Sequence, residues 1–288
     1  MKAASFDYHA PGSVPEALEL LRRLEDSRVI AGGQSLAPML NMRFVVTENL
    51  IDINGIADLD YIREAGKAIE IGAMTRQRAL LESGLLLRRA PVVAEAVRLV
   101  GHLQTRNRGT IGGSLCHLDP AAELPVVVAL YEAVLTVQSG QGRREIASAD
   151  WPAGYMTPAL EPGEILTQVA FEPWAPRHGW CFMELARRHG DFAIVCAGVL
   201  LEADGGTITR ASIALGGVAT GPVRLRDAEQ AIVGRPPSAE TFEAAAVLAK
   251  EIEAMGDAHS SAEYRQRIAG VLVKRALARA AERIGSAA

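Results

Sequence analysis

The chain has 288 residues, enough for two domains or one large one, and its 49% hydrophobic and 22% charged residues are typical of a globular protein. The net charge is −4 at pH 7, with basic and acidic residues interspersed. This argues against a nucleic-acid-binding protein, which would concentrate positive charge. No apolar run reaches the ~20 residues that a membrane-spanning helix needs, and the first residues lack the apolar core of a signal peptide.

The cysteines are three in number and far apart, at Cys116, Cys181 and Cys196. A disulfide framework is therefore not expected, and a reducing, cytoplasmic location fits this pattern. Because no CxxC pair occurs, we expect no iron–sulfur cluster and no metal site in this chain. We interpret the cysteines as small buried apolar side chains.

The first half of the chain predicts two small α/β units. Ser13 to Glu16 forms a capping box with Pro15 near the first helical position, and the leucines that follow lie on one side of a helix over residues 13–24. Further helices are expected to begin at Thr75 and Pro91. Short strands are expected at 28–31, 50–53, 68–71, 134–138 and 165–171.

A change of pattern near Glu172–Pro176, which has the composition of a linker, predicts a domain boundary. We expect one domain over residues 1–174, with subdomains at about 1–58 and 59–174, and a second domain over residues 177–288. In the second domain, strands expected at 181–187, 193–202 and 207–215 form a three-stranded antiparallel sheet, and helices are expected at 224–233, 240–254 and 261–284.

The first candidate binding segment is the glycine-rich loop Ala31–Leu36, which connects a short strand to a helix expected over residues 37–44. Adjacent glycines permit positive φ and remove side chains that would block a close ligand. Backbone N–H groups at a helix start can then converge on phosphate oxygens. Each hydrogen bond to a charged group contributes roughly 1.5–3 kcal/mol, so a few of them would hold a pyrophosphate without Lys or Arg.

The second candidate segment is Gly109–Ser114, which again joins two glycines to a hydroxyl and precedes an apolar helix expected over residues 126–131. Glu123 lies between this segment and the expected helix, and its carboxylate is able to accept hydrogen bonds from ribose or ribityl hydroxyls. Neither loop matches the GxGxxG or GxxxxGK[ST] fingerprint, and a single Gly-Gly pair is most often a tight turn. Two such loops in one α/β region suit a long bipartite ligand. FAD has that shape, with a pyrophosphate between hydroxylated arms.

Eight motifs spread along the chain belong together. They are SFDYHAP, AGGQSL, LIDI, IGAMT and RGTIGGSLCHLDPAAELP in the first part, and GEIL, ARRHGDFA and AEYR in the second. With this set the chain resembles the FAD-binding medium subunits of molybdenum hydroxylases, over essentially its whole length. That family includes bacterial carbon monoxide dehydrogenase, nicotine and N-heterocycle dehydrogenases, and the flavin domain of xanthine dehydrogenase.

The resemblance implies an α+β fold. A two-part FAD-binding domain of the vanillyl-alcohol-oxidase (PCMH-like) type is followed by a C-terminal domain with a three-stranded antiparallel sheet and helices. Glu123 matches a sugar-binding position that is Asp in relatives, and Leu166 matches an apolar contact to the adenine end. The expected FAD-binding residues are Val29, Ile30, Ala31, Gly32, Gly33, Gln34, Ser35, Leu36, Thr110, Ile111, Gly112, Gly113, Ser114, His117, Glu123, Leu166, Met183 and Phe192.

The chain departs from the family pattern at three places. Phe192 stands where carbon monoxide dehydrogenase has a Tyr beside the isoalloxazine ring, so the ring face remains but the hydroxyl is absent. Met183 stands where the xanthine dehydrogenase flavin domain has a Lys. His117 follows Cys116 where carbon monoxide dehydrogenase has small or amide residues; it either contacts the flavin or is a satisfied structural histidine. Without the resemblance, Phe192 would be a core residue of a strand over residues 192–200.

The resemblance implies an oxidoreductase subunit that relays electrons and hydroxylates no substrate by itself. A large subunit would carry the molybdopterin, and a small subunit with two [2Fe–2S] clusters would pass electrons to FAD and on to an external acceptor, in a dimer of heterotrimers. Two alternatives remain. A stand-alone FAD-dependent alcohol oxidase would need a base, for which only His102, His117 and Asp191 lie near the candidate loops. The other alternative is a cofactor-free scaffold module.

Overall fold

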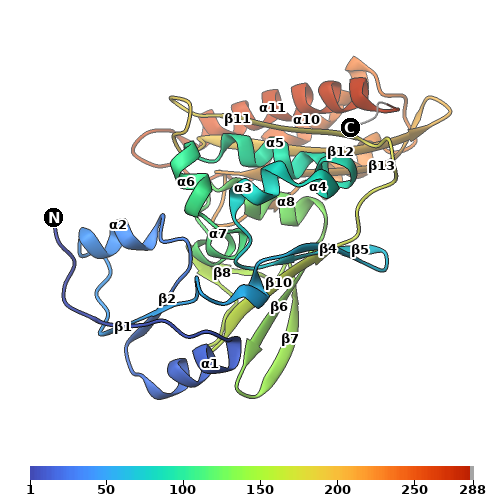
Figure 1. The fold of residues 1–288 in the computed structure, drawn as a ribbon. Helices are drawn as coiled ribbons and strands as arrows, with labels where there is room; N and C mark the ends of the chain where they lie inside the picture. Colours follow the sequence, from blue (N-terminus) through green and yellow to red (C-terminus); the bar gives the residue numbers. More distant parts are fainter. Residues whose placement is uncertain (286–288) are drawn as a thin grey trace.

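The N-terminal unit of the computed structural model, which describes residues 1–285, is a parallel three-stranded sheet with two helices (Figure 1). β3 is the central strand and pairs with β1 and β2. The hydroxyl of Ser13 accepts a hydrogen bond from the backbone N–H of Glu16 at 3.3 Å, which confirms the N-cap of the predicted capping box, while the Glu16 carboxylate accepts from the N–H of Gly12 instead of that of Ser13. The elements are β1 (Asp7–His9), α1 (Val14–Arg23), β2 (Ser27–Ile30), α2 (Leu36–Asn41), β3 (Asn49–Asp52) and the 3-10 helix η1 (Ala57–Leu59).

The middle unit is an antiparallel sheet in the order β4-β5-β10-β6-β7, with helices α3 to α8 beside it (Figure 1). The three strands predicted for this unit are present within one residue of their expected ends. The elements are β4 (Ile62–Ala65), β5 (Ala68–Gly72), α3 (Gln77–Glu82), α4 (Gly84–Arg89), α5 (Pro91–Leu99), α6 (Leu103–Arg108), α7 (Ile111–His117), α8 (Glu123–Leu130), β6 (Val134–Ser139), β7 (Gly142–Ala147), β8 (Pro152–Gly154), β9 (Thr157–Pro158) and β10 (Ile165–Phe171).

The C-terminal unit is an antiparallel sheet in the order β11-β12-β13-β14. Helices α10 and α11 pack on one face, and α5 and α8 pack on the other. Residues 195–201 of β12 are all buried, because the strand is covered on both sides. The predicted strands are present, and a short fourth strand joins them, so the sheet is larger than predicted. The elements are β11 (Gly179–Leu185), β12 (Val195–Asp204), β13 (Thr207–Gly216), β14 (Val223–Arg224), α9 (Arg226–Ile232), α10 (Ala239–Lys250) and α11 (Ala262–Arg283).

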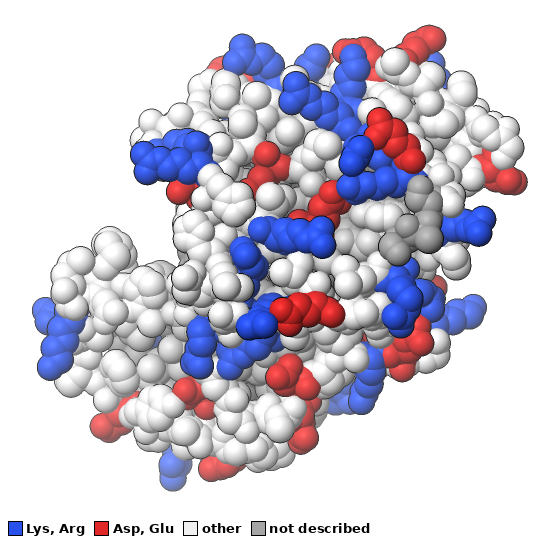
Figure 2. Space-filling model, turned by 45° about the horizontal axis from the view of Figure 1, so that its top comes forward, with Lys and Arg blue, Asp and Glu red and all other residues white. Residues whose placement is uncertain are grey.

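The surface carries both charges and is hollowed on one side. Figure 2 shows Lys and Arg mixed with Asp and Glu on the face in view. It also shows a notch at the left, between a smaller lobe and the main body, on the side where α2 and α6 face each other in Figure 1. Among residues 1–285, no helix is both long enough and apolar enough to cross a membrane.

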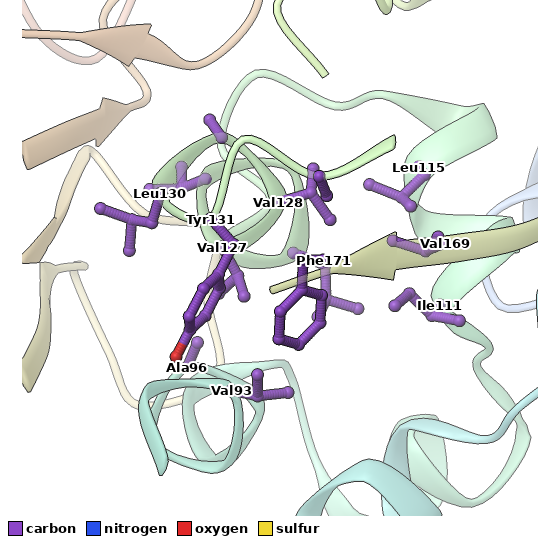
Figure 3. Close-up of a cluster of buried hydrophobic side chains, with 14 of the residues drawn as sticks. Val93, Ala96, Ile111, Leu115, Val127, Val128, Leu130, Tyr131, Val169 and Phe171 are labelled. Atoms are coloured by element: carbon purple, nitrogen blue, oxygen red, sulfur yellow. The ribbon is translucent and has the colours of Figure 1, made fainter. Parts of the chain in front are cut away.

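The largest core lies between the five-stranded sheet and the C-terminal sheet, and α8 passes through it. Every residue of α8 is buried, which its sequence ELPVVVAL permits because its only charged residue is at the first position. Figure 3 shows side chains from α5, α7, α8 and β10 meeting in this core. The rings of Tyr131 and Phe171 stack there with centroids 4.4 Å apart. This packing ties the start of α8, where Glu123 lies, to a rigid part of the molecule.

Three local predictions are wrong in detail. Thr75 does not cap a helix: its hydroxyl donates to the carbonyl of Tyr61 at 2.9 Å, and α3 begins two residues later. The helix expected over residues 37–44 ends at Asn41, because Arg43 adopts a φ of +60°. The expected linker is anchored, since its Trp174 is only 4% exposed. Helices and strands are both present in all three units, so the structure has the mixed helix and strand content that was predicted.

Candidate functional site

The loop after β2 carries backbone N–H groups that have no partner inside the protein. Ser35 occupies the N-cap of α2, yet its side chain caps no N–H group. Within residues 1–285, the N–H groups of Gly33, Gln34, Ser35 and Leu36 donate no hydrogen bond. Gly33 has a φ of +70°, which glycine adopts without strain. A row of free N–H groups in such a loop suits the oxygens of a phosphate.

The second glycine pair lies inside α7 and not in a loop, which corrects the sequence prediction. The N–H of Gly112 donates to the carbonyl of Ala73 at 2.8 Å, and the N–H of Gly113 donates to the side chain of Thr110 at 2.9 Å. These amides are therefore unavailable for a second row of phosphate contacts. Gly112 is required by packing, since a Cβ atom there would lie 2.6 Å from the carbonyl oxygen of Ala73.

The two glycine segments touch each other. A Cβ atom on Gly32 would collide with the carbonyl oxygen of Arg108 and lie 2.8 Å from the Cα atom of Gly109. A Cβ atom on Gly113 would lie 3.6 Å from the Cβ atom of Ala31. We call this contact, between residues 31–33 and residues 108–113, the glycine seam. It joins the N-terminal unit to the middle unit, so the loop that carries the free amides lies against the start of α7.

Two carboxyl groups, buried Glu123 and half-buried Glu184, form no ion pair with a basic side chain among residues 1–285. Glu123, at the start of α8, is 9% exposed, and burial raises its pKa to about 8, with Glu184 and Asp119 adding to the effect. Burial also raises the pKa of Glu184, in β11, to about 7. The Oε2 atom of Glu184 is buried and has no hydrogen-bond partner among the described residues. Both groups can therefore hold a proton near neutral pH and donate a hydrogen bond to a ligand.

The alternation of side chains along β11 places Met183 and Glu184 on opposite faces of the sheet, with Met183 facing away from Glu123. Successive side chains of a strand point to opposite faces. Met183 packs against the helices of the C-terminal unit, whereas Trp180 and Phe182 of the same strand pack against the core that contains α8. Glu184 follows the alternation of Trp180 and Phe182, so it faces the same side as Glu123. Counting alternate positions along β11 places Glu184 on the face of Trp180 and Phe182, but the sequence does not show that α8 covers this face.

Two further residues expected to bind FAD, Leu166 and His117, differ in how far their side chains are exposed. The side chain of Leu166, in β10, is 2% exposed and belongs to the main core, so its side chain does not line the seam. His117 is the last residue of α7 and is half-buried. Burial lowers the pKa of His117, against the opposing charge of Asp119, so the ring is neutral at pH 7.

Phe192 projects from the loop between β11 and β12 and is 72% exposed. The interpretation as a core residue of a strand is therefore wrong, since the strand begins at Val195. The loop rests on the start of α6: a Cβ atom on Gly190 would lie 2.8 Å from Nδ1 of His102, and the rings of His102 and His189 stack with centroids 6.5 Å apart. An exposed aromatic ring thus stands on a loop that the protein holds in place.

Comparison with known proteins identifies the family. Residues 4–174 match the family described as the FAD binding domain in molybdopterin dehydrogenase, and residues 180–280 match the CO dehydrogenase flavoprotein C-terminal domain. The chain belongs to the FAD-binding medium subunits of molybdenum hydroxylases. It is an oxidoreductase subunit and its cofactor is FAD, as the resemblance implied.

The relatives of this FAD subunit match it along their whole length. It is 38% identical to the carbon monoxide dehydrogenase medium chain of Afipia carboxidovorans, over 98% of this chain and 99% of the relative. It is 39% identical to subunit alpha of the 6-hydroxypseudooxynicotine dehydrogenase complex of Paenarthrobacter nicotinovorans, over 98% and 97%. The solved carbon monoxide dehydrogenase of Hydrogenophaga pseudoflava includes a similar chain, with a TM-score of 0.96, 39% identity, and coverage of 99% and 100%.

Proposed function

We propose that this FAD subunit relays electrons within a larger molybdenum hydroxylase. Electrons would pass from the [2Fe–2S] clusters of a small partner subunit through FAD to an external acceptor, while a large partner subunit carries the molybdopterin. The support is that relatives matching the full chain are medium chains or subunits of dehydrogenase complexes. A dimer of two such heterotrimers is the assembly we propose. The three free thiols support a cytoplasmic location, since reducing compartments preserve them.

The observation that carries the proposal is the row of free amides at Gly33–Leu36 beside the glycine seam. FAD has a pyrophosphate near its middle, and backbone N–H groups bind such anions without a basic side chain. The absence of side chains at Gly32 and Gly33 leaves the backbone accessible to a close ligand. We propose that residues 29–36 and 110–114 hold the centre of FAD, with the free hydroxyl of Ser114 beside the amides.

The ends of FAD would be held by groups on either side of the seam. Glu123 is proposed to hydrogen-bond a sugar or ribityl hydroxyl, a role that its buried position and its raised pKa both permit. Leu166 would serve the adenine end through its backbone, because its side chain is enclosed in the core. Phe192 would lie against the isoalloxazine ring, and a neutral His117 would be able to donate one hydrogen bond to a ligand.

The bound flavin would supply the redox chemistry, since it can accept and release electrons one at a time. The work of this chain is then to hold the cofactor, shield one face of it and adjust its potential. Phe192 would cover one face of the flavin, and Glu123 and Glu184, whose pKa values are raised by burial, would place weakly charged carboxyl groups in its surroundings. We propose no acid–base pair or nucleophile of the chain's own for substrate hydroxylation.

We further propose a division into an FAD-binding domain over residues 1–174, of the vanillyl-alcohol-oxidase (PCMH-like) type, and a C-terminal domain over residues 177–288, of which residues 286–288 lie outside the described part. Subdomains at about 1–58 and 59–174 are supported by their separate sheets. The cleft between subdomains is then the flavin site, which agrees with the notch in Figure 2.

One preparation tests the proposal. The chain is expressed together with its natural partners, the complex is purified, and the released flavin is identified by chromatography while molybdenum and iron are quantified. We expect FAD, not FMN, together with molybdenum and iron in the complex. The isolated chain should reduce a dye with an artificial electron donor but hydroxylate no substrate. Only FMN, or substrate turnover by the isolated chain without molybdenum and iron, would contradict the proposal.

A further inference from the structure

Behind the glycine seam, two polar side chains connect the N-terminal unit to the middle unit. Nη2 of Arg76 donates to Oδ1 of Asn54 at 2.6 Å, and Nδ2 of Asn54 donates to the carbonyl of Ala31 at 2.6 Å. Nη1 of Arg76 donates to the carbonyl of Arg108. These three hydrogen bonds thus connect Ala31, on one side of the seam, to Arg108, on the other side.

Asn54 is itself held in place by the neighbouring carboxylate of Asp52. Oδ1 of Asp52 accepts the backbone N–H of Asn54 at 2.8 Å, and the hydroxyl of Tyr8 donates to Oδ2 of the same carboxylate at 2.5 Å. Burial opposes the charge of Asp52, but these hydrogen bonds and the nearby Arg108 keep the pKa of Asp52 below its ordinary value. Asp52 is therefore a carboxylate at neutral pH and fixes the orientation of the Asn54 amide.

The middle unit fixes Arg76 in the same way. The residue forms an isolated β-bridge with Thr110, the N-cap of α7, and the next residue, Gln77, donates its backbone N–H to the carbonyl of Gly109 at 2.8 Å. Arg76 is thus locked to the start of α7 by its backbone and to Asn54 by its side chain. A shift of either unit would have to break these bonds.

We infer that Arg76 and Asn54 are positioning residues for FAD, which set the separation of the two segments that hold the cofactor. This inference rests on the proposed function. The backbones are in direct contact at the seam, because Gly32 and Gly109 meet without space for a methyl group. Without the two side chains, the N-terminal unit would lose the side-chain hydrogen bonds that fix its position relative to α7, and only the apolar core around Met74 and Ile165 and the backbone contacts would still join the two units. The free amides would then no longer be aligned with the rest of the site, although none of them had been altered.

The test compares flavin binding in Arg76→Gln, Asn54→Ala and the double variant of the full chain, with FAD added to flavin-free protein. Each single variant should raise the Kd for FAD about tenfold. The double variant should be no weaker than the poorer single variant, because both changes break one connection. The visible circular dichroism of the bound flavin should change in all three variants. Arg76→Lys, which retains one of the two contacts, should restore part of the affinity.

Arg78→Gln is the matched control, since Arg78 lies in helix α3, of which Arg76 is the N-cap, is exposed, and among residues 1–285 forms an ion pair with Glu82 alone. It should bind FAD as the natural chain does. If Arg76→Gln and Asn54→Ala bind FAD with unchanged Kd, or weaken binding additively with an unchanged flavin spectrum, the positioning role is wrong. If the natural chain and its complex bind no FAD, the proposed function itself fails, so the two failures are distinguishable.

Discussion

Gly32 and Arg108 touch through their backbones, and no side chain fits between them. A Cβ atom on Gly32 would collide with the carbonyl oxygen of Arg108, whereas a Cβ atom on Gly33 would meet side chains alone, those of Ile30 at 3.3 Å and Ala37 at 3.8 Å. Gly33 instead has a positive φ of +70°. Adjacent glycines are therefore required for two different reasons, a close backbone approach at the first and a left-handed conformation at the second.

The two glycines should respond differently to substitution by alanine. Gly32→Ala forces apart two backbones and should cost about 3 kcal/mol of unfolding free energy, with loss of FAD. Gly33→Ala should cost about 1–2 kcal/mol from conformation alone and leave a folded protein with reduced FAD content. Urea unfolding of the flavin-free chain and the flavin content of the purified protein measure the two effects. Equal stability of the two variants, or full FAD content in both, would show this account to be wrong.

Local chemistry explains which elements could be predicted. Ser13 and Pro91 begin helices because their capping and φ preferences act within one turn of the chain, and both were predicted. The helix over Gly112–Gly113 was taken for a loop. That helix is stabilised by Thr75 and Ala73, which accept N–H groups of its first turn from almost forty residues away in the sequence. Such distant acceptors leave no signal in a glycine-rich segment.

In the candidate site, too, the features set by local sequence were predicted and those set by distant contacts were not. The glycine loop at residues 31–36 was recognised because glycines before a helix start have a local meaning. Glu184 was missed, since its importance depends on α8 lying across the same face of the strand. The Arg76–Asn54 connection was missed as well, because it joins two separate units. The sequence pattern indicates which backbone can approach a ligand, but the side chains that align two units become visible only in three dimensions.

Glu123 should make the stability of the flavin-free chain depend on pH. Burial raises its pKa from 4.5 to about 8, so between these values the folded chain retains a proton that the unfolded chain has lost. The free energy of unfolding should therefore fall as the pH rises from about 5 to about 8, by on the order of 3 kcal/mol from this group. Glu184, whose pKa is raised to about 7, should contribute in the same direction.

Glu123→Gln removes the titrating group and should flatten this dependence, with a larger unfolding free energy than the natural chain at pH 8. Urea unfolding at several pH values provides the measurement. Glu82→Gln is the control, since that carboxyl is exposed and paired with Arg78, and its slope should match the natural chain. An unchanged slope in Glu123→Gln would exclude burial of this carboxyl as the cause.

Glu95 in α5 and Arg283 in α11 should hold the C-terminal unit against the middle unit. Two guanidinium nitrogens of Arg283 donate to the two carboxylate oxygens of Glu95 at 2.8 and 2.9 Å, and the backbone N–H of Phe182 donates to the same carboxylate at 3.1 Å. Both side chains are 23% exposed. Arg283→Ala should therefore lower the unfolding free energy by about 2 kcal/mol, because it breaks a partly buried bidentate pair.

Arg279→Ala is the matched control for this interface, because Arg279 is in the same helix and pairs with Glu282 on the surface. Its unfolding free energy should change by less than about 0.5 kcal/mol. Equal losses for the two arginine variants would mean that the contact between units adds nothing beyond a surface ion pair.

Phe192 should affect the flavin and not the stability of the fold. Its ring is 72% exposed, so Phe192→Ala should change the unfolding free energy of the flavin-free chain by less than about 0.5 kcal/mol. In the FAD-loaded protein, loss of the ring should shift the flavin absorption band or reduction potential, because one face would then contact solvent. Phe182→Ala is the contrast, because Phe182 is 3% exposed in the adjacent strand, and it should lower the unfolding free energy by about 3–5 kcal/mol.

Phe192→Tyr should be tolerated and should change the rate at which O2 reoxidises the flavin, because it adds a hydroxyl beside the isoalloxazine ring. Loss of stability in Phe192→Ala with an unchanged flavin spectrum would assign Phe192 to packing and remove it from the flavin site.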